Sequence, residues 1–178
     1  MGDGGQAVSG EVVTVFRRDG DECVASFAVD EVRVLRRVTT ELVELLSARP
    51  DHNDPVVRRL FPDPYPDRPR DAAEYRRYTE SELKAEKLDS AGIVLAGLGG
   101  AEHGELRLDP GAADAWLRGL TDLRLALAVR LGIDADTDLA VEIDAAARQQ
   151  PTAPLAFQLS VYAYLGFLQE SLLDALTD

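Results

Sequence analysis

Residues 155–176 read LAFQLSVYAYLGFLQESLLDAL, a stretch that is apolar on almost every side until Gln169 and Glu170 interrupt it. An ordinary surface helix keeps an apolar stripe and a polar back, so a helix coated in this way is typical of a bundle interior or a subunit interface. The sequence therefore predicts a mainly α-helical, single-domain bundle around a buried C-terminal helix over 154–176. Where the bundle leaves faces of this helix uncovered, Tyr164 and Phe167 would form a two-fold interface, and we expect a homodimer.

At the other end of the chain, two β-rich runs predict a hairpin over 11–29. EVVTVFR and ECVASFAV are separated by a segment that contains Asp19-Gly20, and Asp-Gly between such runs is a strong hairpin signal. A short run over 104–108 also reads as a strand and can extend the hairpin to three strands. We expect residues 1–10, which are rich in glycine, to be disordered, and residues 11–178 to form the domain.

The remaining elements follow from caps and helical spacing. Asp30 is the expected N-cap of a helix over 30–48, and Asp54-Pro55 and Asp109-Pro110 open two others. Two capping boxes, at Asp71 and Thr79, predict two helices or one helix with a bend near residue 79. The predicted helices are 30–48, 54–60, 71–98 and 110–131, and the acidic segment 133–153 is expected to be a mobile loop with at most a short helix over 144–148.

The charge and composition exclude several classes of function. The 178 residues carry a net charge of −13, so a phosphate backbone would repel the chain, and we expect no stand-alone nucleic-acid binding. The N-terminus has no signal-peptide pattern and no run is long enough to span a membrane, which indicates a cytoplasmic protein without membrane contact. Cys23 is the single cysteine, so an intramolecular disulfide cannot form. Its acidic neighbours would raise the thiol pKa, and it is kept as a possible redox residue.

The candidate signatures of an active site do not meet the requirements of their chemistry. Gly97-x-Gly99-Gly100 follows a predicted helix, whereas a phosphate-binding loop follows a strand. The calcium-loop pattern that begins at Asp134 has Leu139 in place of the turn glycine and Ala145 in place of the closing glutamate. We therefore predict no catalytic, cofactor or metal residues, and a hydrolase or metal enzyme is the least favoured of the alternatives.

One charged residue is unusual for a scaffold. Arg124 lies on or beside the leucine stripe of the 110–131 helix, where an unpaired guanidinium would cost several kcal/mol. Glu170 is the candidate partner, and Gln169 can complete the hydrogen bonding. We predict a buried Arg124–Glu170 contact that sets the register of the two helices.

Four motifs follow one another along the chain: Arg59-Leu60-Phe61-Pro62-Asp63-Pro64-Tyr65, Glu74-Tyr75-Arg76-Arg77-Tyr78-Thr79-Glu80, Trp116-Leu117 with Asp122-Leu123-Arg124-Leu125-Ala126-Leu127, and Leu165-Gly166-Phe167-Leu168-Gln169-Glu170. In this order they resemble the motifs of an actinobacterial family, the domain of unknown function DUF2017, which includes the actinomycete oxidative stress regulator AosR. The resemblance runs from about residue 27 to residue 176. It implies a mostly helical cytoplasmic protein without enzymatic residues, often encoded beside the protease adaptor ClpS, with members that regulate transcription together with an alternative sigma factor.

Three classes of function compete at this point. We favour a non-enzymatic regulator that binds a protein partner such as a sigma factor or another transcription component. An accessory or adaptor protein of the ClpS/Clp protease pathway is the alternative, and the enzyme is third. The structural or docking candidates within the motifs are Arg59, Tyr65, Arg76, Arg77, Trp116, Asp122, Arg124, Gln169 and Glu170.

Overall fold

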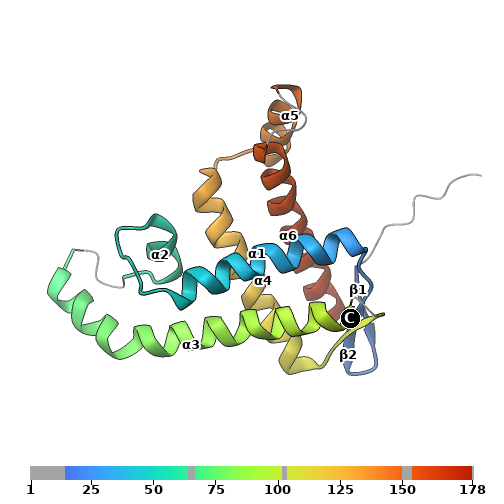
Figure 1. Ribbon diagram of the computed structural model, residues 1–178, viewed down its shortest axis with the longest axis horizontal. Coiled ribbons are helices and arrows are strands. Elements are labelled where there is room, and N and C mark those ends of the chain that lie inside the picture. Colours follow the sequence, from blue (N-terminus) through green and yellow to red (C-terminus); the bar gives the residue numbers. More distant parts are fainter. Residues whose placement is uncertain (1–14, 64–66, 102–103, 150–153, 178) are drawn as a thin grey trace, which may run out of the picture.

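Six helices and three short strands make up the described part of the chain, which in this computed structural model comprises residues 15–63, 67–101, 104–149 and 154–177. In chain order they are β1 (Phe16–Asp19), β2 (Glu22–Ala25), α1 (Val29–Ser47), α2 (Pro55–Leu60), α3 (Pro69–Ala101), β3 (Leu106–Leu108), α4 (Pro110–Leu131), α5 (Leu139–Gln149) and α6 (Pro154–Thr177). In Figure 1, α1 and α3 lie side by side and cross the pair formed by α4 and α6. The predicted mainly helical fold is confirmed.

The C-terminal helix α6 is central to this arrangement, but it is not covered on every side. One face is buried against α4, α5 and β1, and Leu165, Leu168 and Leu172 are fully inaccessible to solvent. Leu155, Phe157, Phe167 and Leu173 on the same helix are each more than 40% exposed. The predicted bundle around the C-terminal helix is thus present, and the other helices pack against only part of the circumference of α6.

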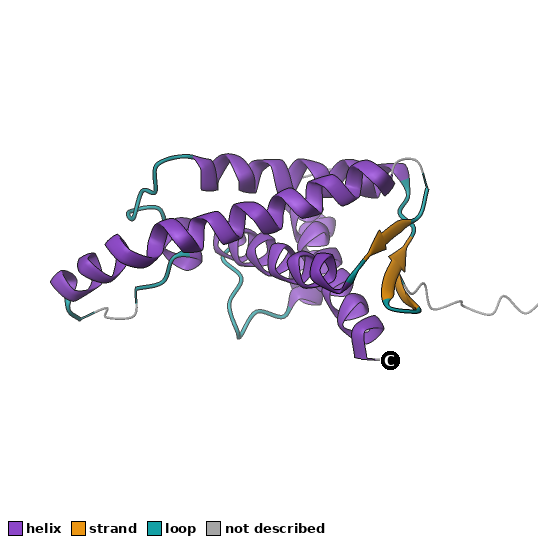
Figure 2. Ribbon diagram, turned by 90° about the horizontal axis from the view of Figure 1, so that it is seen from below, coloured by secondary structure: helices purple, strands orange, loops and turns teal. Residues whose placement is uncertain are grey.

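The three strands form an antiparallel sheet in the order β1-β2-β3, at one end of the helices (Figure 2). Asp19 pairs with Glu22, so the hairpin loop is Gly20-Asp21, and Gly20 supplies the positive φ of 65° that such a tight turn needs. Ser171 of α6 accepts a 2.9 Å hydrogen bond from the backbone N–H of Phe16, which fixes β1 on the helical layer. The strands are shorter than the predicted 11–29 hairpin, and residues 1–14 lie outside the described part of the chain.

Polar caps set several of the helix ends. Asp109 accepts a 2.8 Å bond from the N–H of Ala112 at the start of α4, and Gly132 ends the helix in a left-handed conformation. Asp54 caps α2 in the same way. The cap predicted for the first helix is wrong, because α1 already begins at Val29. Asp30 lies in its first turn, where a carboxylate interacts favourably with the helix dipole.

Helix α3 is one continuous helix of 33 residues, so it has no second start at Thr79. The Thr79 hydroxyl donates a 3.0 Å bond to the carbonyl of Tyr75 one turn earlier, so it does not cap a helix N-terminus. Figure 1 shows the helix curving over its N-terminal part rather than breaking. The predicted end at residue 98 is wrong, because the helix continues through Gly99 and Gly100 to Ala101. Gly97 lies against Leu106 and Trp116, where a side chain would crowd both.

The acidic segment after α4 is more ordered than predicted. Residues 139–149 form α5, and Asp138 caps it by accepting bonds from the N–H groups of Ala140 and Val141. The expectation of a mobile loop over 133–153 is therefore wrong for most of its length, although residues 150–153 lie outside the described part of the chain. An alanine-rich segment with a polar cap at its start needs only partial burial to stay helical.

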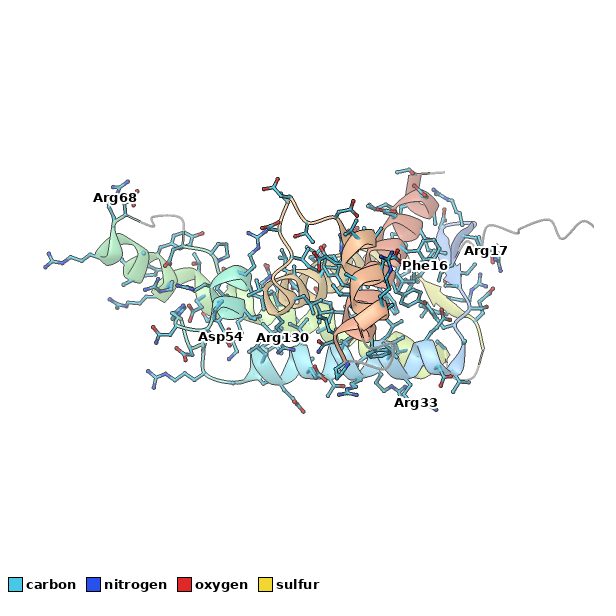
Figure 3. All side chains as sticks on the ribbon, turned by 90° about the horizontal axis from the view of Figure 1, so that it is seen from above. Phe16, Arg17, Arg33, Asp54, Arg68 and Arg130 are labelled. Carbon is cyan, nitrogen blue, oxygen red and sulfur yellow. The ribbon has the colours of Figure 1, made fainter. Side chains whose placement is uncertain are left out.

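An aromatic cluster fills the junction between the sheet and the helices. The rings of Phe16, Phe27 and Trp116 lie 5.9–6.2 Å apart, with the Phe27 and Trp116 rings stacked and Phe16 edge-on to both. Phe16 points from β1 toward the helices in Figure 3, whereas Arg17 points away. Trp116 is fully buried, so this member of the third motif forms part of the core.

Candidate functional site

Polar side chains on α4 border two neighbouring cavities. A cavity of about 350 Å³ lies between α3 and α4, and a cavity of about 600 Å³ is bordered by α2, α4 and α6. Thr121 and Leu125 line both cavities, so the two lie on either side of the same turn of α4. The third and fourth motifs, which were singled out in the sequence, meet at this turn.

The smaller cavity contains a buried ion pair. Lys87 Nζ of α3 donates to Asp122 Oδ1 of α4 at 2.6 Å, and the two side chains are only 15% and 6% exposed. Burial raises the pKa of the Asp122 carboxyl, while the bond and the charge of Lys87 act in the opposite direction. The candidate Asp122 thus has a structural partner, which joins α3 to α4.

A second polar contact lies in the same cavity, one turn closer to the N-terminus of α4. Arg118 Nε donates to the Ser90 hydroxyl at 3.3 Å, and Ser90 is 3% exposed. A guanidinium cannot take a proton from a hydroxyl group, so this contact does not activate Ser90 as a nucleophile. Lys87, Ser90 and Arg118 were not among the predicted site residues. Helical spacing is the sequence signal that could have found them. Lys87 and Ser90 are three residues apart and Arg118 and Asp122 are four residues apart, so each pair lies on one face of its helix.

The larger cavity contains Arg124, and its partner differs from the one predicted. Arg124 Nη1 donates to the Gln169 side-chain oxygen at 2.6 Å, and the Gln169 amide donates to the Thr121 hydroxyl at 2.8 Å. Glu170 is exposed and is not the partner of Arg124 in the described structure. Successive residues of a helix point about 100° apart, so α6 can direct only one of this adjacent pair toward α4. The predicted Arg124–Glu170 contact is therefore wrong.

The guanidinium of Arg124 is also held by two apolar surfaces. It lies over the ring of Tyr162, 5.4 Å from the ring centre, and against Gly166, where a Cβ atom would be 3.6 Å from the guanidinium carbon. Arg124 Nε is buried and has no hydrogen-bond partner among the described residues. The guanidinium is thus fixed in position with one of its donors unused.

Arg59 reaches the same cavity from α2, so that residues of the first, third and fourth motifs lie around one space. Neither Arg59 nor Arg124 forms an ion pair within the described ranges. Asp134 is the acid that lines the cavity, and its Oδ1 already accepts bonds from the Thr137 hydroxyl and the Asp136 N–H, which lower the pKa of the Asp134 carboxyl.

The other candidates of the first two motifs lie elsewhere. Arg76 of α3 donates to both oxygens of Asp63, which ties the proline-rich segment to the helix. Arg77 is exposed on α3, and Tyr65 lies outside the described residues.

Cys23 is buried in β2, 3% exposed. Burial raises the pKa of its thiol, whereas the sequence assigned that effect to the acidic neighbours.

A third cavity, of about 500 Å³, separates α1 from the N-terminal half of α6. We call it the α1/α6 groove, and its charged rim consists of Arg33, Arg37, Arg130 and Glu41. Figure 3 shows Arg33 and Arg130 on the side of the molecule along which α1 runs. Phe157, 54% exposed, lies in the apolar part together with Val34, Val38, Leu127 and Val161.

The described residues contain neither a metal-binding cluster nor a membrane-spanning helix. Within these ranges, no group of three or more histidine, cysteine, aspartate or glutamate side chains is arranged to hold a metal ion. None of the helices in the described part of the chain has the length and apolar character needed to span a bilayer.

Comparison with known proteins identifies a family and a relative. The sequence model of one family, described as "Domain of unknown function (DUF2017)", matches residues 13–176. The chain is also similar to a protein of Mycobacterium leprae (strain TN) named "Putative oxidative stress regulator AosR". The two are 32% identical over 171 residues, which cover 88% of this chain and 71% of the relative. No solved structure matches the chain significantly.

Proposed function

This chain belongs to the DUF2017 family, and we propose that it is a non-enzymatic regulatory protein that acts by binding a protein partner in the α1/α6 groove. The regulatory role rests on the similarity to the AosR relative, whose name describes an oxidative stress regulator. The place of binding rests on one structural observation, the exposed apolar floor of the groove around Phe157. Large aromatic side chains in a concave apolar surface are typical anchors of protein interfaces.

The charges around the groove indicate the chemistry of the partner. Three arginines and one glutamate line it, although the chain as a whole carries a net charge of −13. The ion pairs of these arginines, Arg33–Asp30, Arg37–Glu41 and Arg130–Glu41, are all solvent-exposed, and exposed pairs contribute at most about 1 kcal/mol. A partner can therefore replace them at little cost. We propose that the occupant is an acidic segment of another protein with apolar side chains that cover Phe157.

A sigma factor or another transcription component is the partner class that the family resemblance implies. A pull-down from a cell extract tests this proposal, with the full chain as bait. The wild-type chain and the variant Phe157→Asp are compared. Phe167→Asp is the matched control, because Phe167 is 41% exposed on the same helix but does not line the groove. Mass spectrometry of the captured proteins should identify a transcription component that binds to the wild type and to Phe167→Asp and is lost with Phe157→Asp.

Other results would contradict part or all of this proposal. Recovery of ClpS or a Clp protease subunit with the same dependence on Phe157 would favour the alternative function, an adaptor of that pathway. Equal capture of a transcription component by all three baits would place its binding site elsewhere. Self-association that only Phe157→Asp abolishes, measured by light scattering, would make a second copy the occupant of the groove. The homodimer that the sequence predicts through Tyr164 and Phe167 would instead be abolished by Phe167→Asp.

A further inference from the structure

We propose that the cavity between α2, α4 and α6 binds a small organic anion, a phosphate or carboxylate attached to an apolar group. Arg59 of α2 and Arg124 of α4 are 65 residues apart in the sequence, and both line this cavity of about 600 Å³. That volume is within the usual range for a small-molecule site. This proposal does not depend on the proposed function, because the cavity and the α1/α6 groove share no lining residue.

The hydrogen bonding of Arg124 is the first argument. The partner of its guanidinium is the neutral amide of Gln169, so the bond leaves the positive charge uncompensated. Its Nε is buried and has no partner among the described residues, and a buried donor without an acceptor costs about 1–3 kcal/mol. An oxyanion in the cavity would supply the opposite charge that the guanidinium lacks.

The fixed geometry of the site is the second argument. The Arg124 guanidinium, which comes from α4, is held against α6 by Tyr162, Gly166 and Gln169. Ligand binding would therefore require little further ordering of this side chain. Arg59 is exposed on α2 and forms no ion pair within the described part of the chain, although acidic residues outnumber basic ones by 32 to 19 in the sequence. Two arginines that line one cavity and form no ion pair with any described residue indicate a negatively charged ligand.

The remaining lining decides which kind of anion fits. Leu125, Ala128, Val129 and Ile133 form apolar walls, and the Thr121 hydroxyl and Gln169 amide add polar groups beside Arg124. A free inorganic ion would leave these walls in contact with water, whereas an anion with an apolar body covers them. Asp134 at the edge would oppose a ligand of high charge, which favours one anionic group rather than several.

Titration of the full-length, ¹⁵N-labelled chain with phenyl phosphate tests the proposal, with inorganic phosphate and phenol as comparison probes. The arginine Nε–H signals report directly on Arg59 and Arg124. We expect saturable shifts of the Arg124 signal with phenyl phosphate, weaker binding of inorganic phosphate, and no saturable binding of phenol. Arg59→Gln and Arg124→Gln should each weaken the binding of phenyl phosphate by about 10- to 100-fold, the usual effect of losing a charged hydrogen bond.

Arg58→Gln is the matched control, because Arg58 is the exposed neighbour of Arg59 on α2 and does not line the cavity. It should bind phenyl phosphate like the wild type. Arg59 is exposed, so Arg59→Gln keeps the test decisive even where Arg124→Gln disturbs the fold. Affinities that are equal in Arg58→Gln and Arg59→Gln would overturn the proposal. So would phenol binding as tightly as phenyl phosphate, or no response to any probe at millimolar concentration.

Discussion

The two ends of the α4/α6 helix pair are packed in opposite ways. At the sheet end, where α4 begins and α6 ends, Trp116 and Leu172 are fully buried and the aromatic rings of the core are in contact. At the other end, which we call the open end, Phe157 is half exposed. The cavity that contains Arg124, which we call the Arg124 cavity, lies there between α2, α4 and α6, and the α1/α6 groove separates α6 from α1. The same two helices thus provide a dense core at one end and concave surfaces at the other.

This difference in packing assigns different roles to the two ends, folding stability to the sheet end and binding to the open end. Dense apolar packing at the sheet end stabilises the fold, since each buried large side chain contributes about 1.5–3 kcal/mol. The arginines of the open end are held by an amide, an aromatic ring or exposed acids. We therefore expect substitutions at the sheet end to affect unfolding, and substitutions at the open end to affect binding with little loss of stability.

The largest expected effect comes from Trp116→Ala. The substitution removes a fully buried indole that contacts Phe16 and Phe27, and truncation of such a side chain costs about 3–5 kcal/mol. Phe157→Ala at the open end should cost about 1 kcal/mol or less, because its ring is 54% exposed. Urea unfolding followed by circular dichroism measures both. Similar losses in the two variants would remove the distinction between the ends.

The sheet end is also the part of the fold that the sequence predicts best. The Asp-Gly turn signal and the Asp109-Pro110 cap are local, and each acts in the structure as its residue type requires. The short strand predicted over 104–108 is present over 106–108, and it pairs with β2. Local backbone preferences decided these elements, so a single sequence was sufficient to predict them.

The open end was predicted less well because its features depend on tertiary contacts. The identity of the Arg124 partner turns on which of two adjacent residues, Gln169 or Glu170, faces α4, and that depends on the rotation of α6 about its axis. The ion pair of Lys87 with Asp122 joins residues that are 35 positions apart, and it could not be deduced from either helix alone. The convergence of Arg59 on the same cavity as Arg124 likewise follows only from the placement of α2.

A second prediction concerns the ion pair between the two ends. Lys87→Met leaves the Asp122 carboxylate buried without its cation and should destabilise the protein by about 2–3 kcal/mol at pH 7, since removing one partner of a buried pair is strongly unfavourable. The pKa of this carboxyl is already raised by burial, so the folded state holds its proton to a higher pH than the unfolded chain does. The free energy of unfolding therefore increases as the pH falls through the folded-state pKa of Asp122. The loss of stability in Lys87→Met, relative to the wild type, should accordingly be smaller at pH 5 than at pH 7.

Two comparisons test this explanation. The double variant Lys87→Met with Asp122→Leu replaces both charges by apolar groups and should recover all but about 1 kcal/mol of the loss. Urea midpoints at pH 7 and pH 5 measure the single and double variants under the same conditions. A deficit of Lys87→Met that is the same at both pH values would show that lost packing, rather than the uncompensated Asp122 charge, is responsible.

The smallest expected effect compares two glycines, one in each region. A Cβ atom at Gly119 would lie 2.9 Å from Val94 Cγ2, and because Val94 is short and stiff at χ1, Gly119→Ala should destabilise the protein by about 1–2 kcal/mol. At Gly166 the same atom would meet the Arg124 guanidinium at 3.6 Å, an ordinary van der Waals distance. Alanine is favoured over glycine in a helix interior, so Gly166→Ala should be neutral or more stable by up to about 1 kcal/mol. Thermal unfolding of the two variants measures both effects. A destabilised Gly166→Ala would mean that the open end is packed as tightly around Arg124 as the sheet end is around Trp116.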